Sequence, residues 1–220
     1  MKGLKNLKIM LLISIVCLVF SETAFATLSY SIADMSPDWE GGPFYVNVYD
    51  NNTLLTGFVS YCLEKNEYLD FSTKFLGTID DYAIQGGSGF SNKGGTETAP
   101  TIPGKDYLNP WTEWLVANYL SHSLVTDQRR KDFQNAIWYI EGEIDSYTPG
   151  EFDYYTAVKN ADPGDDIPWI RVLNLYSYTR DGRKIDNQSL IYVPEPGVLI
   201  LLGIGLTAVG LAGRRFRKTS

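Results

Sequence analysis

Two apolar segments, one near each end of the chain, limit which residues can fold together into a water-exposed domain. Residues 1–26 begin with three lysines, continue through an apolar run over residues 9–20 and reach a small-x-small site that ends at Ala26. This order predicts a secretory signal peptide cleaved after Ala26. The rest of the chain is therefore expected to fold outside the cytoplasm.

The second apolar segment lies near the C-terminus and is bounded on both sides by short motifs. Pro194, Glu195 and Pro196 precede an apolar stretch over residues 198–213, and a basic cluster follows at residues 214–218. A helix of that length covers most of a hydrocarbon core of ~30 Å. The basic cluster predicts a cytoplasmic C-terminus, with the bulk of the protein on the other side of the membrane.

Residues 194–220 resemble the PEP-CTERM sorting signal of Gram-negative bacteria in the order and spacing of these three parts. The resemblance implies that an exosortase-type enzyme processes the chain near the Pro-Glu-Pro motif. It also implies a transient anchor through the C-terminal transmembrane helix, followed by delivery to the cell surface or the extracellular matrix. The signal indicates a location and no activity.

The segment between the two ends, residues 27–193, has the length of a single domain with a sizeable core. It keeps 12 of the 19 basic residues and 24 of the 26 acidic ones, a net charge near −12. This balance argues against nucleic acid and anionic lipid as partners, because both select basic surfaces. The membrane is therefore expected as a partner only through the C-terminal helix, and most acidic side chains are expected to be solvated.

Hydrophobic periodicity predicts an α+β domain with strands in both halves around a helical middle. The expected strands are 44–49, 58–63, 170–178 and 190–193, with a turn at 50–52. The expected helices begin at Pro110, run from a cap at Asp127 to Ile140, and span 151–161. Residues 86–105 are rich in Gly, Ser, Thr and Pro and predict a long exposed loop.

Cys62 has no cysteine partner in the predicted exported domain, since the other cysteine, Cys17, falls in the signal peptide. An oxidising compartment normally pairs thiols, so an odd one indicates intermolecular pairing or an unusual reactivity. Cys62 follows Tyr61 and precedes Leu63 at the end of a predicted strand.

The second predicted helix places a glutamine beside a tryptophan. Gln134 and Trp138 are four residues apart and share one side of the helix, whereas Phe133, Ile137 and Ile140 form an apolar face. A glutamine amide is costly to bury unless its polar atoms find partners. The simplest interpretation is that Gln134 points into solvent and that Trp138 is an ordinary core aromatic.

Taken together, the two segments resemble the internal thioester domains of bacterial surface adhesins. Those domains carry an aromatic-Cys-apolar motif on a strand and an apolar-Gln-x-x-apolar-Trp motif on a helix. The matching residues here are Tyr61, Cys62, Leu63, Phe133, Gln134, Ile137 and Trp138. The Gln-x-Ala element of one branch is present at residues 134–136, although Phe133 stands where that branch often has threonine. The tail also departs from the best-known members, which are Gram-positive and have a different anchoring signal.

The resemblance implies that Cys62 and Gln134 form a thioester with loss of ammonia, surrounded by Tyr61, Leu63, Phe133, Ile137 and Trp138. An amine or hydroxyl on a surface protein or polysaccharide then attacks the acyl group once per molecule. This is covalent adhesion without turnover, so no enzyme activity, cofactor or metal is expected.

Three alternatives remain open on the sequence. A non-covalent structural or carbohydrate-binding component of the matrix would use the fifteen tyrosines and five tryptophans as a binding face. A cysteine hydrolase would use Cys62 as nucleophile and His122, the one histidine, as base. The aspartates at 162, 165 and 166 would supply oxygen ligands for calcium, although their spacing does not fit an EF-hand.

Overall fold

The computed structural model describes residues 28–35, 40–67, 69–84, 105–164 and 166–194. Within them, six strands form an antiparallel sheet of order β3-β2-β1-β4-β7-β8. These strands are β1 (Leu28–Asp34), β2 (Phe44–Asp50), β3 (Thr53–Ser60), β4 (Lys74–Asp80), β7 (Arg171–Tyr178) and β8 (Lys184–Tyr192). Two short strands, β5 (Tyr82–Ala83) and β6 (Asp106–Tyr107), pair separately.

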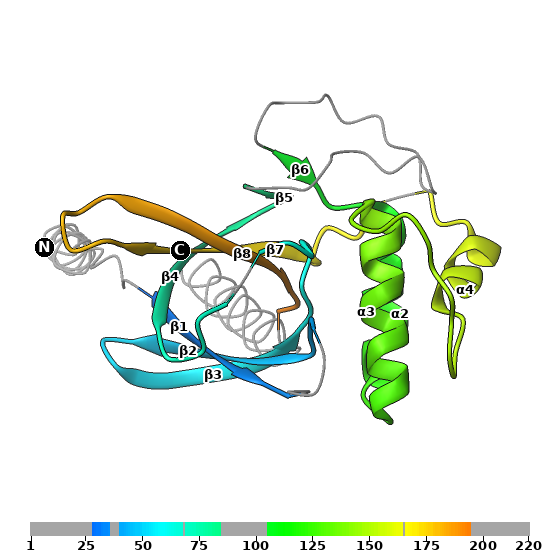
Figure 1. Cartoon of the computed structure of the whole chain (residues 1–220), viewed down its shortest axis with the longest axis horizontal. Helices are drawn as coiled ribbons and strands as arrows, with labels where there is room; N and C mark the ends of the chain where they lie inside the picture. Colours follow the sequence, from blue (N-terminus) through cyan, green and yellow to red (C-terminus); the bar gives the residue numbers. More distant parts are fainter. Residues whose placement is uncertain (1–27, 36–39, 68, 85–104, 165, 195–220) are drawn as a thin grey trace, which may run out of the picture.

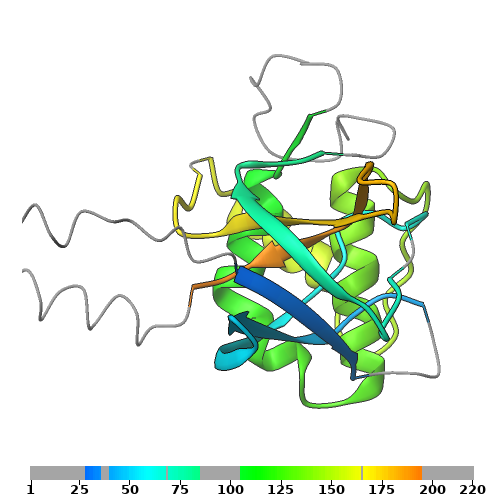
Figure 2. The ribbon, with the colours of Figure 1, turned by 90° about the vertical axis from the view of Figure 1, so that its left-hand side faces the viewer.

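Three helices, α2 (Pro110–Ser123), α3 (Asp127–Glu141) and α4 (Tyr154–Ala161), gather at one end of the sheet (Figure 1). Seen from the opposite end, the strands lie in front of α2 and α3 (Figure 2). The predicted α+β class, with strands in both halves around a helical middle, is confirmed.

The sheet curls until its two edges meet just beyond the end of β3. The N–H of Leu63 donates to the carbonyl of Ser189 over 3.1 Å, and the N–H of Ile191 donates to the carbonyl of Tyr61 over 3.1 Å. Between these bonds, Cys62 pairs with Leu190 of β8 as an isolated bridge. Edge strands otherwise expose unpaired backbone groups, so this junction removes an edge and fixes the backbone around Cys62.

The β2–β3 hairpin matches the predicted alternation, but the position of Cys62 does not. The turn residues Asn51 and Asn52 have positive φ angles of 46° and 66°, as tight hairpins require. However, β3 runs over Thr53–Ser60, so the predicted strand 58–63 is wrong at its C-terminal end. The chain pairs with β2 only as far as Ser60 and then crosses to β8, which leaves Cys62 between the two strands.

The helices begin close to their predicted positions. Asn109 caps α2 by accepting the N–H of Trp111, and Gly142 ends α3 with a φ of 86°. The predicted cap at Asp127 is wrong by one residue, because the hydroxyl of Thr126 accepts the N–H of Arg129. The third helix begins at Tyr154 rather than at residue 151, since Asp153 caps it.

Strands β1 and β4 are absent from the prediction, and β8 begins at Lys184, before the predicted strand 190–193. The predicted signal peptide, the loop at 86–104 and the tail from Glu195 onward, with the predicted transmembrane helix, lie outside the described residues. No helix in the described part of the chain is long and apolar enough to span a membrane.

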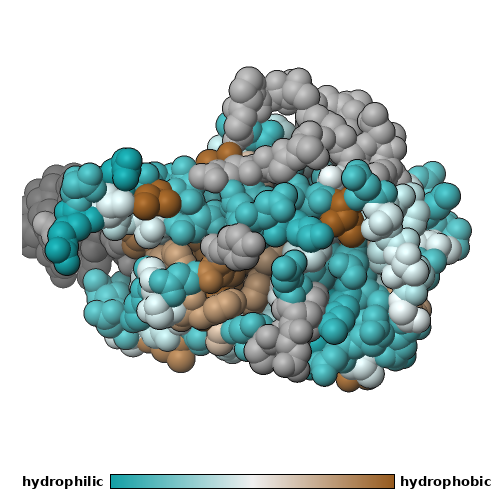
Figure 3. All heavy atoms as spheres, in the orientation of Figure 1, coloured by the Kyte–Doolittle hydropathy of each residue, from teal (hydrophilic) through white to brown (hydrophobic). Residues whose placement is uncertain are grey.

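Two buried hydrophobic clusters divide the core, and α3 contributes to both. Phe133 and Ile137 pack among the helices, whereas Trp138 joins Cys62 in the cluster inside the sheet. On the surface, hydrophobic side chains gather over the strands, and the helical end is mostly hydrophilic (Figure 3). Because Phe133 and Ile137 join one cluster and Trp138 joins the other, Gln134 lies on the part of α3 that contacts both clusters.

The loop after α3 is held by one buried carboxylate, that of Asp132. Its Oδ1 accepts the N–H of Gly150 over 2.9 Å and an N–H of Gln128 over 2.8 Å. Its Oδ2 accepts the N–H groups of Glu151 and Phe152 over 2.6 and 2.9 Å. This contact explains why residues 150–152 form a loop instead of the predicted first turn of the helix.

We expect Asp132→Ala to lower the free energy of unfolding by about 2–4 kcal/mol, because it leaves several backbone N–H groups unpaired. Asp127→Ala, which removes the exposed ion pair of Asp127 with Arg130 on the same helix, is the control and should cost less than about 1 kcal/mol. Urea denaturation measures both. Equal losses in the two variants would contradict the anchoring role of Asp132.

Candidate functional site

The side chain of Gln134 is completely buried and lies against the backbone of Cys62. Its Oε1 accepts the N–H of Cys62 over 3.0 Å, and its Nε2 donates to the carbonyl of Cys62 over 2.9 Å. The two residues are 72 positions apart in the chain. The fold therefore brings the amide of Gln134 onto the backbone of Cys62, and the structure excludes the simpler interpretation that Gln134 points into solvent.

A second backbone donor reaches the same oxygen. The N–H of Gly42 donates to Gln134 Oε1 over 2.9 Å. Gly42 precedes β2, and its neighbour Gly41 has a φ of 93°, a conformation that glycine adopts at little cost. A Cβ on Gly41 would lie 2.8 Å from Gln134 Cγ and 2.8 Å from Trp138 Cη2. The absence of side chains at this glycine pair lets the backbone approach the amide.

Cys62 and Trp138 border a cavity of about 150 Å³. A cavity of about this volume accommodates a benzene-sized molecule, so the end of a side chain fits inside. The indole Nε1 of Trp138 is buried and has no acceptor among the described residues. The other lining residues are Asp34, Glu40, Gly41, Phe44, Glu64, Lys65, Glu67, Leu69, Phe71 and Gln188.

The thiol of Cys62 is only 3% exposed, which makes the thiolate hard to form. Burial raises the pKa of Cys62 well above its ordinary value, and the nearby charge of Glu64 raises it further. A hydrogen bond from the backbone of Gly42 acts in the opposite direction. At neutral pH the group is therefore a protonated thiol, and any reaction at sulfur requires a proton acceptor.

The remaining predicted packing residues lie on the other side of Cys62 and Gln134. Tyr61 and Leu63 alternate with Cys62 along the chain and point into the helical cluster. The rings of Tyr61 and Phe133 are 4.8 Å apart, and Ile137 belongs to the same cluster. These four residues pack against the side of the Cys62 segment and of α3 that faces the helical cluster. Trp138 instead lines the cavity together with Cys62.

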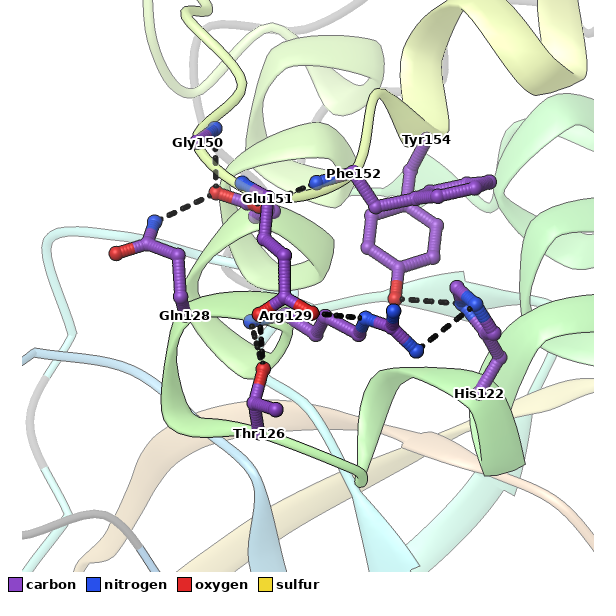
Figure 4. A network of polar contacts seen from close by, with 9 residues as sticks. His122, Thr126, Gln128, Arg129, Gly150, Glu151, Phe152 and Tyr154 are labelled. Atoms are coloured by element: carbon purple, nitrogen blue, oxygen red, sulfur yellow. Dashed lines mark hydrogen bonds and ion pairs between the residues drawn. The ribbon is translucent and has the colours of Figure 1, made fainter.

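His122 makes its contacts within the helical end of the molecule. Its Nδ1 lies 3.0 Å from the hydroxyl of Tyr154, and its Nε2 lies 3.2 Å from Arg129 Nη1 (Figure 4). None of the described residues that line the cavity is a histidine. The geometry therefore gives His122 no place as the base of Cys62.

The predicted acidic turn at 162–166 is described except for Asp165. Within the described residues, no group of three or more His, Cys, Asp or Glu side chains is placed to hold a metal ion. Asp162 instead ends α4 with a φ of 43°.

Sequence reasoning missed three residues of this site. Gly41 and Gly42 carry no side-chain chemistry, and their one local signal is the Gly-Gly-Pro run ahead of a strand. Glu64 follows Cys62 by two positions but was expected to be solvated like most acidic residues. Two-residue spacing in an extended segment is the signal that places it on the same side as the sulfur.

Comparison with known proteins identifies only the C-terminal end. Residues 193–218 match the PEP-CTERM protein-sorting motif. The chain carries a PEP-CTERM sorting signal. The PEP-CTERM motif indicates an exported protein that is transiently anchored in the membrane and processed by an exosortase, as the Pro-Glu-Pro sequence predicted. No curated protein and no solved structure matches the chain.

Proposed function

We propose that this PEP-CTERM protein carries an internal thioester between Cys62 and Gln134 and uses it to attach covalently to a surface protein or polysaccharide. The observation that carries the proposal is the buried amide of Gln134, held through both its oxygen and its nitrogen by the backbone of Cys62. A buried amide in such a position is costly unless it is fully paired, and here its partners include the backbone N–H and carbonyl of the one cysteine in the predicted exported domain.

Formation of the bond begins with attack of Cys62 Sγ on the side-chain carbonyl carbon of Gln134. The C–S bond forms, the C–N bond breaks, and the thiol proton leaves with the nitrogen as ammonia. Negative charge develops on Oε1 during the attack, and two backbone N–H groups, those of Gly42 and Cys62, already donate to that oxygen. Donors preorganised at a developing oxyanion stabilise the transition state.

Proximity of the two groups also lowers the activation barrier for thioester formation. An intramolecular, well-oriented pair gains about 7–11 kcal/mol over a bimolecular reaction when the geometry is ideal. The backbone of Cys62 is fixed by pairing with Leu190, and Gln134 is fixed on α3. Packing behind the pair by Tyr61 and Phe133 limits access of water from that side.

Capture reverses the chemistry with a different nucleophile. An amine or hydroxyl entering the cavity attacks the acyl carbon of residue 134, an amide or ester forms, and the Cys62 thiol is released. Each molecule reacts once, which suits a protein exported to the cell surface or the surrounding matrix and accounts for one unpaired cysteine in that location.

Non-covalent binding to a matrix carbohydrate is the second candidate, and one observation favours it. Phe71 lines the cavity and is 46% exposed, in ring contact with Phe44. Aromatic rings at a cavity rim offer an apolar face with little conformational cost. Binding of this kind would survive Cys62→Ala, whereas covalent attachment would not.

Intact-mass measurement of the freshly purified exported chain tests the thioester directly. We expect a mass about 17 Da below that of the sequence, the mass of one ammonia, and uptake of methylamine at Gln134 with release of one thiol. Cys62→Ala should show the full sequence mass and no uptake. A wild-type chain with its full mass and a titratable Cys62 thiol would sink the proposal.

A further inference from the structure

A carboxyl group with an incomplete set of partners lies beside the sulfur in the cavity. The side chain of Glu64 is 3% exposed and lines the same cavity as Cys62. Its Oε2 accepts the N–H of Ser189 over 3.0 Å, whereas its Oε1 is buried and receives no N–H or hydroxyl donor in the described part of the chain. The carboxyl group of Glu67 forms a side-chain hydrogen bond with Glu64. A hydrogen bond between two carboxyl groups requires a proton on one of them, so the pair is placed to hold and exchange a proton.

Glu67 provides a second carboxyl group next to the first. Its Oε2 is also buried and receives no N–H or hydroxyl donor in the described part of the chain, and Glu67 lines the same cavity. Burial, then the adjoining Glu67, raises the pKa of Glu64 to about 9, and burial also raises the pKa of Glu67. At neutral pH, Glu64 therefore carries a proton, through which the two carboxyl groups form a hydrogen bond.

The other charged side chains that line the cavity are also mostly acidic. Asp34 and Glu40 add two further acidic side chains, against one basic residue, Lys65. Such a lining attracts a cation and gives no comparable attraction to a neutral hydroxyl. A primary amine is a cation in water at neutral pH, with a pKa of about 10.4 for lysine.

From this juxtaposition we propose that the Glu64–Glu67 carboxyl pair receives the ammonium group of a primary amine in the cavity, accepts its proton, and returns a proton to Cys62 sulfur when the thioester opens. The inference rests on the thioester proposed above. It names lysine-type amines as the substrate class and these two carboxyl groups as the proton-transfer device.

Glu64 and Glu67 account for every proton that moves during capture of the amine. The ammonium gives one proton to the Glu67 carboxylate, and the neutral amine attacks the acyl carbon of residue 134. The C–N bond forms, and the C–S bond breaks with its electron pair on sulfur. The pair donates one proton to sulfur and takes the remaining surplus proton from nitrogen. An amide and a thiol result, and the pair then releases one proton to solvent.

Formation of the thioester requires the same kind of proton transfer between sulfur and nitrogen. The thiol proton must move from sulfur to the departing nitrogen, and Cys62 is protonated at neutral pH because burial disfavours its thiolate. Other charged groups surround the pair and belong to its electrostatic environment: Asp34, Glu40, Lys65, Asp106, Glu143 and Asp186.

The test compares Glu64→Gln with Asp145→Asn in the full exported chain. Both remove one carboxyl group, but Asp145 is exposed and lies outside the cavity lining, whereas Glu64 is buried beside the sulfur. A glutamine at position 64 keeps an oxygen for the N–H of Ser189, so the fold is expected to persist. Glu67→Gln is the second variant, and it removes the group that accepts the ammonium proton.

With methylamine as the probe, we expect Glu64→Gln to slow capture at neutral pH about 100-fold, the usual worth of general acid–base catalysis. Asp145→Asn should stay within about 3-fold of wild type, since exposed charges are screened by salt. The wild-type rate should change little between about pH 7 and pH 9, because ammonium is accepted directly. In Glu67→Gln, which lacks the acceptor of the ammonium proton, the rate should rise about tenfold per pH unit, following the free amine.

Each outcome separates this inference from the thioester itself. A wild-type chain without the ammonia mass deficit refutes the thioester before any amine is added. The carboxyl-pair inference alone is overturned by a different result. In that result, wild type, Glu64→Gln and Glu67→Gln all show the mass deficit and capture methylamine at similar rates with the same pH slope. A folded Glu64→Gln chain without the deficit supports it, since formation requires the same proton exchange.

Discussion

Gln134→Ala is expected to abolish amine capture and to lower the free energy of unfolding by about 3–5 kcal/mol. The variant removes the acyl carbon that the thioester requires. It also leaves the N–H groups of Gly42 and Cys62 and the carbonyl of Cys62 without their partner in a fully buried position.

Gln134→Glu separates the effect on thioester formation from the effect on the free energy of unfolding. A protonated glutamate keeps an acceptor for both N–H groups and a donor for the carbonyl of Cys62, so we expect it to lose only about 1–2 kcal/mol. It carries no amide nitrogen to expel, so the ammonia deficit is absent. Chemical denaturation and intact mass, measured on the same samples, read out the two effects.

Asn135→Ala is the control on the same helix, because Asn135 is half-buried and is not part of the contact with Cys62. It should keep the mass deficit and the capture of methylamine. Capture by Gln134→Ala at the wild-type rate would show that residue 134 is not the acyl donor.

Local patterns predicted the helical part of this site well. The sequence from Phe133 to Trp138 places apolar and polar residues at helical spacing, and the cap at Thr126 and the glycine at 142 bound the helix within a residue of the prediction. Gln134 and Trp138 do share a side. These features depend on interactions within one helix, which a single sequence shows directly.

The strand part of the site depended on contacts between distant segments, and the prediction was correspondingly weaker. Cys62 lies in a junction with Leu190, 128 residues away, instead of in a simple hairpin strand. Strand β8 begins with residues 184–189, which are polar except for Ile185, so its alternation is hidden until its pairing with β7 is known.

Burial of charge was the other property that the sequence did not reveal. Glu64, Glu113, Asp132 and Glu141 are all buried, although the acidic composition favours solvated side chains. Asp132 accepts three backbone N–H groups from residues 150–152, and Glu113 accepts the backbone N–H of Ile167, 54 residues along the chain. A carboxylate is buried where such donors converge, and that convergence is a tertiary property.

Gly41→Ala should have an effect comparable with that of Gln134→Ala, although it changes a residue with no side-chain chemistry. The backbone at Gly41 has a φ of 93°, which costs about 1–3 kcal/mol for an alanine. Its Cβ would lie 2.8 Å from Gln134 Cγ and from Trp138 Cη2, on a helix that is packed on both sides. We therefore expect a total loss of about 2–5 kcal/mol in the free energy of unfolding.

Gly182→Ala isolates the contact from the backbone strain. Gly182 has a φ of 83°, but a Cβ there meets nothing within 4 Å, so this variant should lose only the conformational part, about 1–3 kcal/mol. The difference between the two variants measures the contacts with Gln134 and Trp138 together. Only Gly41→Ala should also slow the appearance of the ammonia mass deficit, because it displaces the Gln134 carbonyl from the N–H of Gly42. If the deficit appears equally fast in both variants, the close approach of Gly41 is a packing feature and does not position the reacting carbonyl.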